Sequence, residues 1–305
     1  MTSLPSGITL FERGWLSSNN ILLEDDEQSL LVDSGYFSHS AQTISLVRAH
    51  LGERSLSRLV NTHLHSDHCG GNAALQQHYP ELKIFVPPGN SQHVFSWDPV
   101  LLSYEPTGQY CPPYIAHGAL DIGDSFVAAN LRWDILAAPG HDPHSVVFFN
   151  QTHGILISAD ALWENGFGVV FPEIEGVDAF DEVESTLNFI QSLDARLVIP
   201  GHGSTFCEVG DALKRAYKRL NYFRDAPQKH ALYAAKVLVK FKLLELQTCP
   251  TSIFKAWARN TSYLHLLQTK HWPSMSFDLW LNMLLEQLQS SNALAIEDEV
   301  NRPGF

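Results

Sequence analysis

Short apolar runs alternate with polar turns along the first two thirds of the chain. Residues 21–23 and 29–32 flank the acidic turn 24–27 and are typical of two short strands. Similar runs predict further strands at 59–62, 84–86, 126–128, 132–137, 146–149, 155–158 and 197–199. Apolar positions at helical spacing predict helices over 41–50 and 181–193 and the start of one at 72–78. Residues 87–118, rich in Pro, Tyr and Gly, are typical of a long loop.

This order of strands followed by helices occurs twice. It predicts an α/β (α+β) fold of two halves, with the sheets packed face to face and the helices outside. From residue 211 the pattern is almost wholly helical until 293–297. We therefore predict one domain over residues 1–210 and a second, mostly helical domain over residues 211–305.

The charge distribution agrees with this division. The net charge is −13, but residues 1–210 hold 7 Lys and Arg against 25 Asp and Glu, whereas residues 211–305 hold 13 against 8. The acidic part argues against broad contact with nucleic acid, because phosphate binding relies on Lys and Arg. The basic part leaves that option open, although a solvated helical face is the plainer interpretation.

Composition places the chain among ordinary globular proteins, with 45% hydrophobic and 17% charged residues. No apolar run reaches the ~20 residues that a membrane helix needs. Residues 1–16 lack the basic stretch and apolar block of a secretory signal. The four cysteines are far apart and form no CxxC pair, which fits a reducing compartment. We expect a cytoplasmic protein that makes no membrane contact.

The densest group of chemically active residues is the segment His63-Leu64-His65-Ser66-Asp67-His68. Its first two histidines are two apart, so on an extended segment they point to the same face. Three imidazoles and a carboxylate suit zinc and similar divalent ions. Adjacent residues cannot all converge on one ion, so we expect further ligands from distant strand ends. The chain offers His141 in a Pro-Gly-His segment, Asp160 after the run 155–159, and His202 in Pro-Gly-His-Gly.

The ordered set HxHxDH, PGH, SAD and PGHG resembles the metallo-β-lactamase superfamily over about residues 8–210. Asn20 and residues 32–35 also resemble that family's opening hairpin. The resemblance implies a four-layer αββα sandwich, which agrees with the two predicted halves. It also implies a centre with two divalent metal ions. The first ion would be held by His63, His65 and His141, the second by Asp67, His68 and His202, and Asp160 would bridge them.

The implied centre is hydrolytic. A water bridging two cations is deprotonated near neutral pH and attacks a carbonyl or phosphorus centre. Asp67 would help to orient the hydroxide or pass a proton to the leaving group, which makes it the candidate catalytic residue. Asp142 and His144 are expected to support a histidine or to face the substrate. Zinc is the first expectation for the metal, and the same ligands accept iron or manganese.

Residues around the motifs narrow the substrate class. The residue at the bridging position is Asp160 and not a cysteine, which distinguishes this chain from the zinc β-lactamases. The ligand set is similar to that of hydroxyacylglutathione hydrolases, lactonases and RNA-processing members. His65 stands where diiron flavoproteins have Glu, which favours hydrolysis over oxygen reduction. Trp163 stands where homoserine-lactone lactonases carry Tyr, and residues 162–171 lack the Gly-Cys-Arg stretch of the glutathione thioesterases.

Two features allow more than one interpretation. Trp163, Phe167 and Phe171 either line a substrate pocket or belong to the core. The segment from residue 211 resembles the winged-helix-like domain of some relatives, through residues 230–238, 277–288 and 293–300. That domain would cap the metal cleft or mediate a homodimer.

We therefore predict an enzyme: a dinuclear-metal hydrolase that cleaves a thioester, ester or lactone bond of a small-molecule substrate. A single-stranded RNA endonuclease is the alternative, favoured only by the basic C-terminal part. A third hypothesis is a non-catalytic, ligand-binding regulatory protein on the same fold, which the intact ligand set disfavours.

Overall fold

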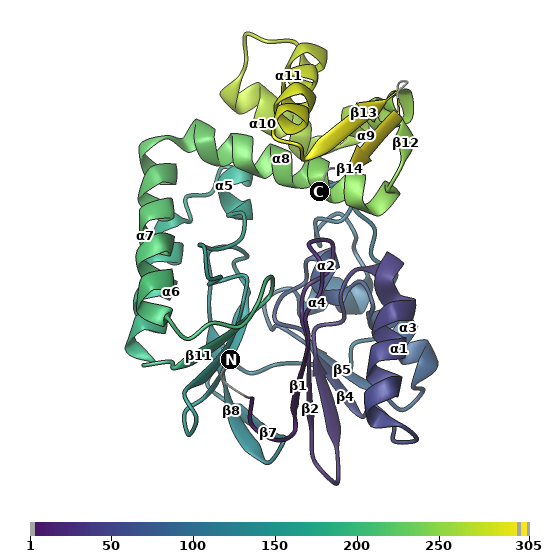
Figure 1. Ribbon diagram of the computed structural model, residues 1–305, viewed down its shortest axis with the longest axis vertical. Helices are drawn as coiled ribbons and strands as arrows, with labels where there is room; N and C mark the ends of the chain where they lie inside the picture. Colours follow the sequence, from purple (N-terminus) through teal and green to yellow (C-terminus); the bar gives the residue numbers. More distant parts are fainter. Residues whose placement is uncertain (1–3, 298–299, 304–305) are drawn as a thin grey trace.

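Two β-sheets packed face to face form the centre of the molecule (Figure 1). The computed structural model describes residues 4–297 and 300–303. The first sheet has the strand order β1 (Ile8–Phe11), β2 (Asn20–Glu24), β3 (Ser29–Val32), β4 (Arg58–Val60), β5 (Lys83–Val86) and β6 (Gly118–Ala119). The second has the order β11 (Leu197–Pro200), β10 (Ile155–Ala159), β9 (Val146–Asn150), β8 (Leu131–Ala137) and β7 (Ser125–Ala128).

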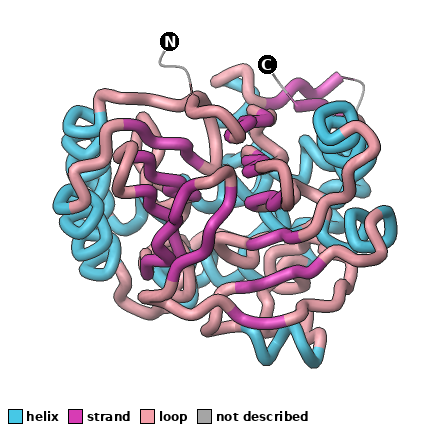
Figure 2. The backbone as a smooth tube through the Cα atoms, turned by 90° about the horizontal axis from the view of Figure 1, so that it is seen from below, coloured by secondary structure: helices cyan, strands magenta, loops and turns pink. Residues whose placement is uncertain are grey.

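Helices cover the outer face of each sheet. α1 (Ser40–Leu51) and α3 (Asn72–His78) pack on the first sheet, and α6 (Phe180–Ser192) and α7 (Val209–Asp225) pack on the second. Seen from below in Figure 2, the strands lie between helices on both sides. The predicted αββα sandwich is confirmed.

The alternation of side chains along the strands explains these layers, because successive residues of a strand point to opposite faces. In β2, Leu23 joins the apolar core between the sheets, while Leu22 joins the core beneath α1. In β3, Leu30 faces inward and Leu31 outward in the same way. Both faces of the sheet are therefore buried, and the strands read as unbroken apolar runs in the sequence.

A second apolar core lies in the C-terminal part. It is built by α8 (Pro227–Leu246), α9 (Thr251–Asn260), α10 (Ser262–His271) and α11 (Phe277–Ser290). A small sheet of order β12 (Cys249–Pro250), β14 (Val300–Pro303) and β13 (Leu294–Glu297) completes it. The mostly helical C-terminal part predicted from the sequence is confirmed. Residues 298–299 of the predicted closing segment lie outside the described residues.

The helix α7 begins at Val209 and therefore spans the predicted domain boundary at residue 210. Its apolar face, which includes Ala212, Ala216 and Leu220, belongs to the core beneath the second sheet. The division into 1–210 and 211–305 stays a prediction, and α7 packs on the sandwich side of it. In Figure 1 this helix runs up the outside of the molecule and leads into α8, which crosses above the two sheets.

The prediction of an irregular loop over residues 87–118 was wrong in part. A helix, α4 (Ser91–Ser96), lies within it, and β6 begins at its last residue. Short helices η1 (Phe37–His39), α2 (Ser66–Cys69) and α5 (Phe171–Glu175) were also not predicted. Elements of two to six residues are too short for a periodic apolar pattern. Among the described residues, no helix has the length and apolar character needed to cross a bilayer.

Candidate metal centre

The seven predicted ligands lie at the carboxyl ends of strands, at the edge of the sandwich below α8 (Figure 1). The segment from His63 to His68 follows β4 and includes the short helix α2. His141 follows β8, Asp160 directly follows β10, and His202 follows β11. Because these strands belong to two packed sheets, residues far apart in the sequence meet in one place.

The first group consists of His63, His65 and His141, whose ligand atoms lie within 4.8 Å of one another. Nε2 of His141 lies 2.9 Å from Nδ1 of His65 and 3.3 Å from Nε2 of His63. The Nδ1–H of His141 donates to the carbonyl oxygen of Val169, which leaves a lone pair on Nε2. The ring nitrogens therefore converge on a common point, as ligands of one cation do.

The second group consists of Asp67, His68 and His202. Nε2 of His202 lies 3.1 Å from Oδ2 of Asp67. Nε2 of His68 is fully buried and has no hydrogen-bond partner among the described residues. A buried polar atom without a hydrogen bond is costly, so this nitrogen is suited to bind a cation.

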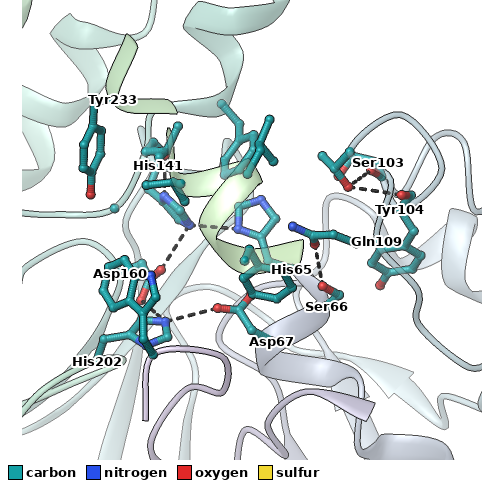
Figure 3. A pocket seen from close by; sticks show the side chains of 18 of the residues that line it. His65, Ser66, Asp67, Ser103, Tyr104, Gln109, His141, Asp160, His202 and Tyr233 are labelled. Carbon is teal, nitrogen blue, oxygen red and sulfur yellow. Dashed lines mark hydrogen bonds and ion pairs between the residues drawn. The ribbon is translucent and has the colours of Figure 1, made fainter. Parts of the chain in front are cut away.

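Asp160 lies between the two groups (Figure 3). Its Oδ2 is 3.4 Å from Nε2 of His141, and its Oδ1 is 3.4 Å from Nε2 of His68. One carboxylate oxygen thus faces each group. The indole N–H of Trp163 donates to Oδ1 at 3.2 Å.

The backbone beside Asp160 is irregular. The pairing of β10 with β11 shifts register between Ile157 and Ala159, and Ala159 has a φ of 46°. Such irregularities near the end of a strand re-aim a side chain. They direct Asp160 toward the histidines.

Electrostatics prepare this cluster for cations. Burial lowers the pKa of His65 and of His141 to about 4, so both are neutral at pH 7, which is the form that binds a metal. Burial favours neutral Asp160 and Asp67, but the imidazole of His68 and that of His202 outweigh it and lower both carboxyl pKa values.

His68 behaves in the opposite way. Burial disfavours its charged form, yet the carboxylates of Asp160, Asp33 and Asp67 together raise its pKa well above the usual range. The same negative charge that favours a proton on this ring favours a metal cation in its place. A proton and a metal ion therefore compete for its Nε2.

The backbone leaves room for this arrangement only because glycines line it. A Cβ atom on Gly201 would lie 2.3 Å from Oδ1 of Asp160, and one on Gly168 would lie 2.3 Å from Nδ1 of His141. Together with the converging lone pairs and the partnerless nitrogen of His68, this cradle fits a pair of divalent cations. The structure brings all seven predicted residues together.

A pocket opens over the cluster. His65, Asp67, His141, Asp160 and His202 form its floor. Trp163 and Phe171 line the pocket, whereas Phe167 is buried in the core. The pocket interpretation is therefore correct for the first two residues, and the core interpretation for Phe167. Its other lining residues were not predicted: Trp15, Ser66, Ser103, Tyr104, Thr107, Gln109, Gly168, Val169, Tyr233, Val237, Leu238 and Phe241. For α8, an available signal was the helical spacing of positions 233, 237, 238 and 241.

Asp142 and His144 lie beside the first group of ligands. Oδ2 of Asp142 lies 3.9 Å from Nε2 of His65, and Oδ1 accepts a hydrogen bond from the backbone N–H of His144. The ring of His144 packs against Gly89 and lines a second hollow beside the first. Neither residue belongs to the ligand groups found among the described residues.

Comparison with known proteins agrees with this picture. The chain is 28% identical over 198 residues to a hydroxyacylglutathione hydrolase of Xanthomonas campestris, a match that covers 63% of each protein. It is 25% identical over 187 residues to an atrochrysone carboxyl ACP thioesterase of Aspergillus fumigatus, which covers 61% of this chain and 51% of that protein. The chain thus matches less than two thirds of the length of these relatives.

The fold of the whole chain also occurs elsewhere. The crystal structure of a metallo-beta-lactamase family protein of Thermus thermophilus covers 99% of this chain and is itself covered completely, with a TM-score of 0.60 and 19% identity. That likeness includes the C-terminal part. Residues 13–202 match the model of the metallo-beta-lactamase superfamily. On this match and on the geometry of its seven-residue cluster, the chain belongs to the metallo-beta-lactamase superfamily.

Proposed function

We propose that this protein is a dinuclear metallohydrolase that cleaves an ester-like bond, in the first place a thioester, of a small-molecule substrate. The observation that carries this proposal is the position of Asp160, with one carboxylate oxygen facing each group of ligands. A carboxylate so placed would contribute a ligand to each of two cations, as in paired hydrolytic sites. The names of the hydrolase and thioesterase relatives agree with it.

Two divalent cations at this centre would activate a water molecule for attack and stabilise the negative charge that develops on the substrate oxygen. The chain's own residues do the rest. Asp67 is ionised at neutral pH because His68 and His202 lower its pKa. Its carboxylate lines the pocket floor, where it can orient the attacking water and carry a proton toward the leaving group. Aromatic side chains line the pocket on both sides of this carboxylate.

A phosphodiester substrate finds no support in the pocket. None of its lining residues in the described part of the chain is Lys or Arg, although phosphate recognition relies on these side chains. Arg219 lies behind Tyr233, with its guanidinium 4.4 Å from the centre of that ring. Within the described ranges, the basic C-terminal part thus brings no Lys or Arg to the lining of the pocket.

The test is hydrolysis by the zinc-loaded protein of a thioester, a lactone and a phosphodiester in parallel. We expect thioester cleavage, and we expect His63→Ala to reduce it by about a thousandfold because an ion would lose a ligand. His153→Ala, in an exposed turn, is the matched control and should leave the rate unchanged. Equal rates for wild type and His63→Ala would reject the proposed site.

A further inference from the structure

One face of α8 forms the roof of the pocket over the candidate metal centre. Tyr233, Val237, Leu238 and Phe241 all line it. They are spaced four, one and three residues apart, so they lie on one side of the helix. In Figure 3, Tyr233 extends from the helix above with its hydroxyl directed toward the side where Asp160 and His202 lie. The C-terminal part of the chain thus supplies a wall of the site.

The facing walls are aromatic. The ring of Phe171 lies 4.6 Å from that of His65, centre to centre, and 5.7 Å from that of His141. Trp15 and Trp163 lie 5.2 and 5.4 Å from the ring of His202. Apolar surfaces therefore flank both ends of the ligand cluster.

The charged groups of the pocket are confined to its floor. Among the described lining residues, only the five from the ligand cluster carry ionisable carboxylates or imidazoles, and the remainder are apolar, aromatic or neutral polar. A substrate carboxylate or phosphate placed under α8 would be desolvated without a cationic partner, which is costly. An apolar group there would instead be favoured by burial.

We propose that the surface formed by Val237, Leu238, Phe241 and Phe171 is an acyl-binding subsite. It takes the apolar acyl chain of a thioester or ester whose carbonyl carbon lies at the metal centre. This inference rests on the proposed function and deepens it, because it names the part of the substrate that the enzyme selects. It separates this protein from enzymes that select an anionic glutathione group, since the subsite has no cation to hold one.

The direct test is binding of straight-chain carboxylates, from acetate to octanoate, to the zinc-loaded protein by isothermal titration. The carboxylate head is held at the metal centre in every case, so the difference reports on the chain. Each buried methylene strengthens binding by about fourfold. We expect octanoate to bind at least about a hundredfold more tightly than acetate, since several methylenes would be buried. Trp15 and Trp163 at the pocket provide a fluorescence readout of the same event.

A variant pair locates the effect. Val237→Asp places a carboxylate in the subsite, at a partly buried position of the helix, and should weaken octanoate binding by about tenfold or more through the desolvation of that charge. Acetate binding should stay unchanged. Val127→Asp, the same change at an exposed valine of β7 at the far end of the second sheet, should alter neither. Val237→Phe, which keeps the helix apolar, should shorten the longest carboxylate that binds tightly.

The outcomes separate this inference from the proposed function. Binding that strengthens with chain length in the wild type and loses this dependence in Val237→Asp supports the subsite. If the protein then hydrolyses no thioester, only the proposed function fails. Equal affinities for acetate and octanoate overturn the subsite, and thioester hydrolysis without acyl preference would then leave the proposed function standing. Octanoate binding that is equally tight in wild type, Val237→Asp and Val237→Phe also overturns it.

Discussion

The Oδ2 atom of Asp33 accepts a hydrogen bond from Nδ1–H of His68 at 2.8 Å, and both side chains are buried. This bond fixes the tautomer of the imidazole and turns its Nε2 toward the second group of ligands. Asp33 is itself held firmly, because its Oδ1 accepts from the backbone N–H of Thr62 and its Oδ2 from the Thr62 hydroxyl. The residue has a φ of 55°, a backbone conformation that costs free energy outside glycine.

Replacing this carboxylate tests its role in positioning His68. We expect Asp33→Asn to weaken binding of the second metal ion by about 10- to 100-fold, because an amide in place of Oδ2 no longer holds the ring in one tautomer. Metal titration with a competing chelator measures the effect, and circular dichroism checks the fold. Asp26→Asn, in an exposed turn, is the control. Unchanged affinity for both ions in Asp33→Asn would show that His68 needs no such support.

The close approach of Gly201 to Asp160 gives a steric test. A methyl group at residue 201 would lie 2.3 Å from Oδ1 of Asp160 and 3.0 Å from the backbone carbon of Ala159. We expect Gly201→Ala to displace the carboxylate and lower metal affinity by about tenfold or more. Gly210→Ala is a matched control, because a Cβ there meets nothing within 4 Å. If both alanine variants bind metal like the wild type, the cradle does not position Asp160.

A buried histidine joins α8 to the loop that carries the pocket wall. Nε2 of His230 accepts a hydrogen bond from the backbone N–H of Val170 at 3.1 Å. Burial lowers the pKa of His230 to about 3, and the positive charge of Arg219 acts in the same direction. The folded protein therefore keeps this ring neutral, whereas the unfolded chain protonates it below about pH 6.5.

This difference predicts a loss of stability in acid. As the pH falls from about 6.5 toward 3, the unfolded state takes up a proton that the folded state refuses, so the stability present above pH 6.5 is lost. Between pH 7 and pH 5, the free energy of unfolding should fall by about 2 kcal/mol more in the wild type than in His230→Gln. Denaturant titrations at the two pH values measure this. The substitution leaves every other histidine in place, so their contribution cancels between the two proteins. His153→Gln should retain the full wild-type dependence of the free energy of unfolding on pH. The same dependence in His230→Gln and the wild type would contradict the assignment.

The sandwich and the ligand cluster could be predicted because their signals are local. The segment from His63 to His68 carries four ligands within six residues, and His141, Asp160 and His202 each follow a recognisable apolar run. The apolar runs of β3, β9, β10 and β11 were clear because both faces of these strands are buried. Asp33 could be associated with the family's opening hairpin, but its bond to His68 depends on the parallel pairing of β3 with β4.

The pocket could not be predicted, because its walls meet only through tertiary packing. Val237 and Phe241 lie on a helix that buries apolar residues on more than one face. Their helical spacing alone therefore does not show that this side of the helix crosses the metal centre. The residues from the 87–118 segment that reach the pocket, such as Tyr104 and Gln109, come from irregular chain without a periodic pattern. From the sequence, Trp163 and Phe167 were equally good candidates for the pocket lining. Only their burial in the structure shows that Trp163 lines the pocket and that Phe167 belongs to the core.

The central claim is that the seven-residue cluster holds two divalent ions. The most direct measurement is the metal content of the purified protein at neutral pH after equilibration with zinc and removal of free ions, determined by plasma mass spectrometry. We predict about two equivalents per chain, with a marked loss in Asp160→Ala. A wild-type protein that retains no metal, or an Asp160→Ala variant that retains as much as the wild type, would contradict this claim.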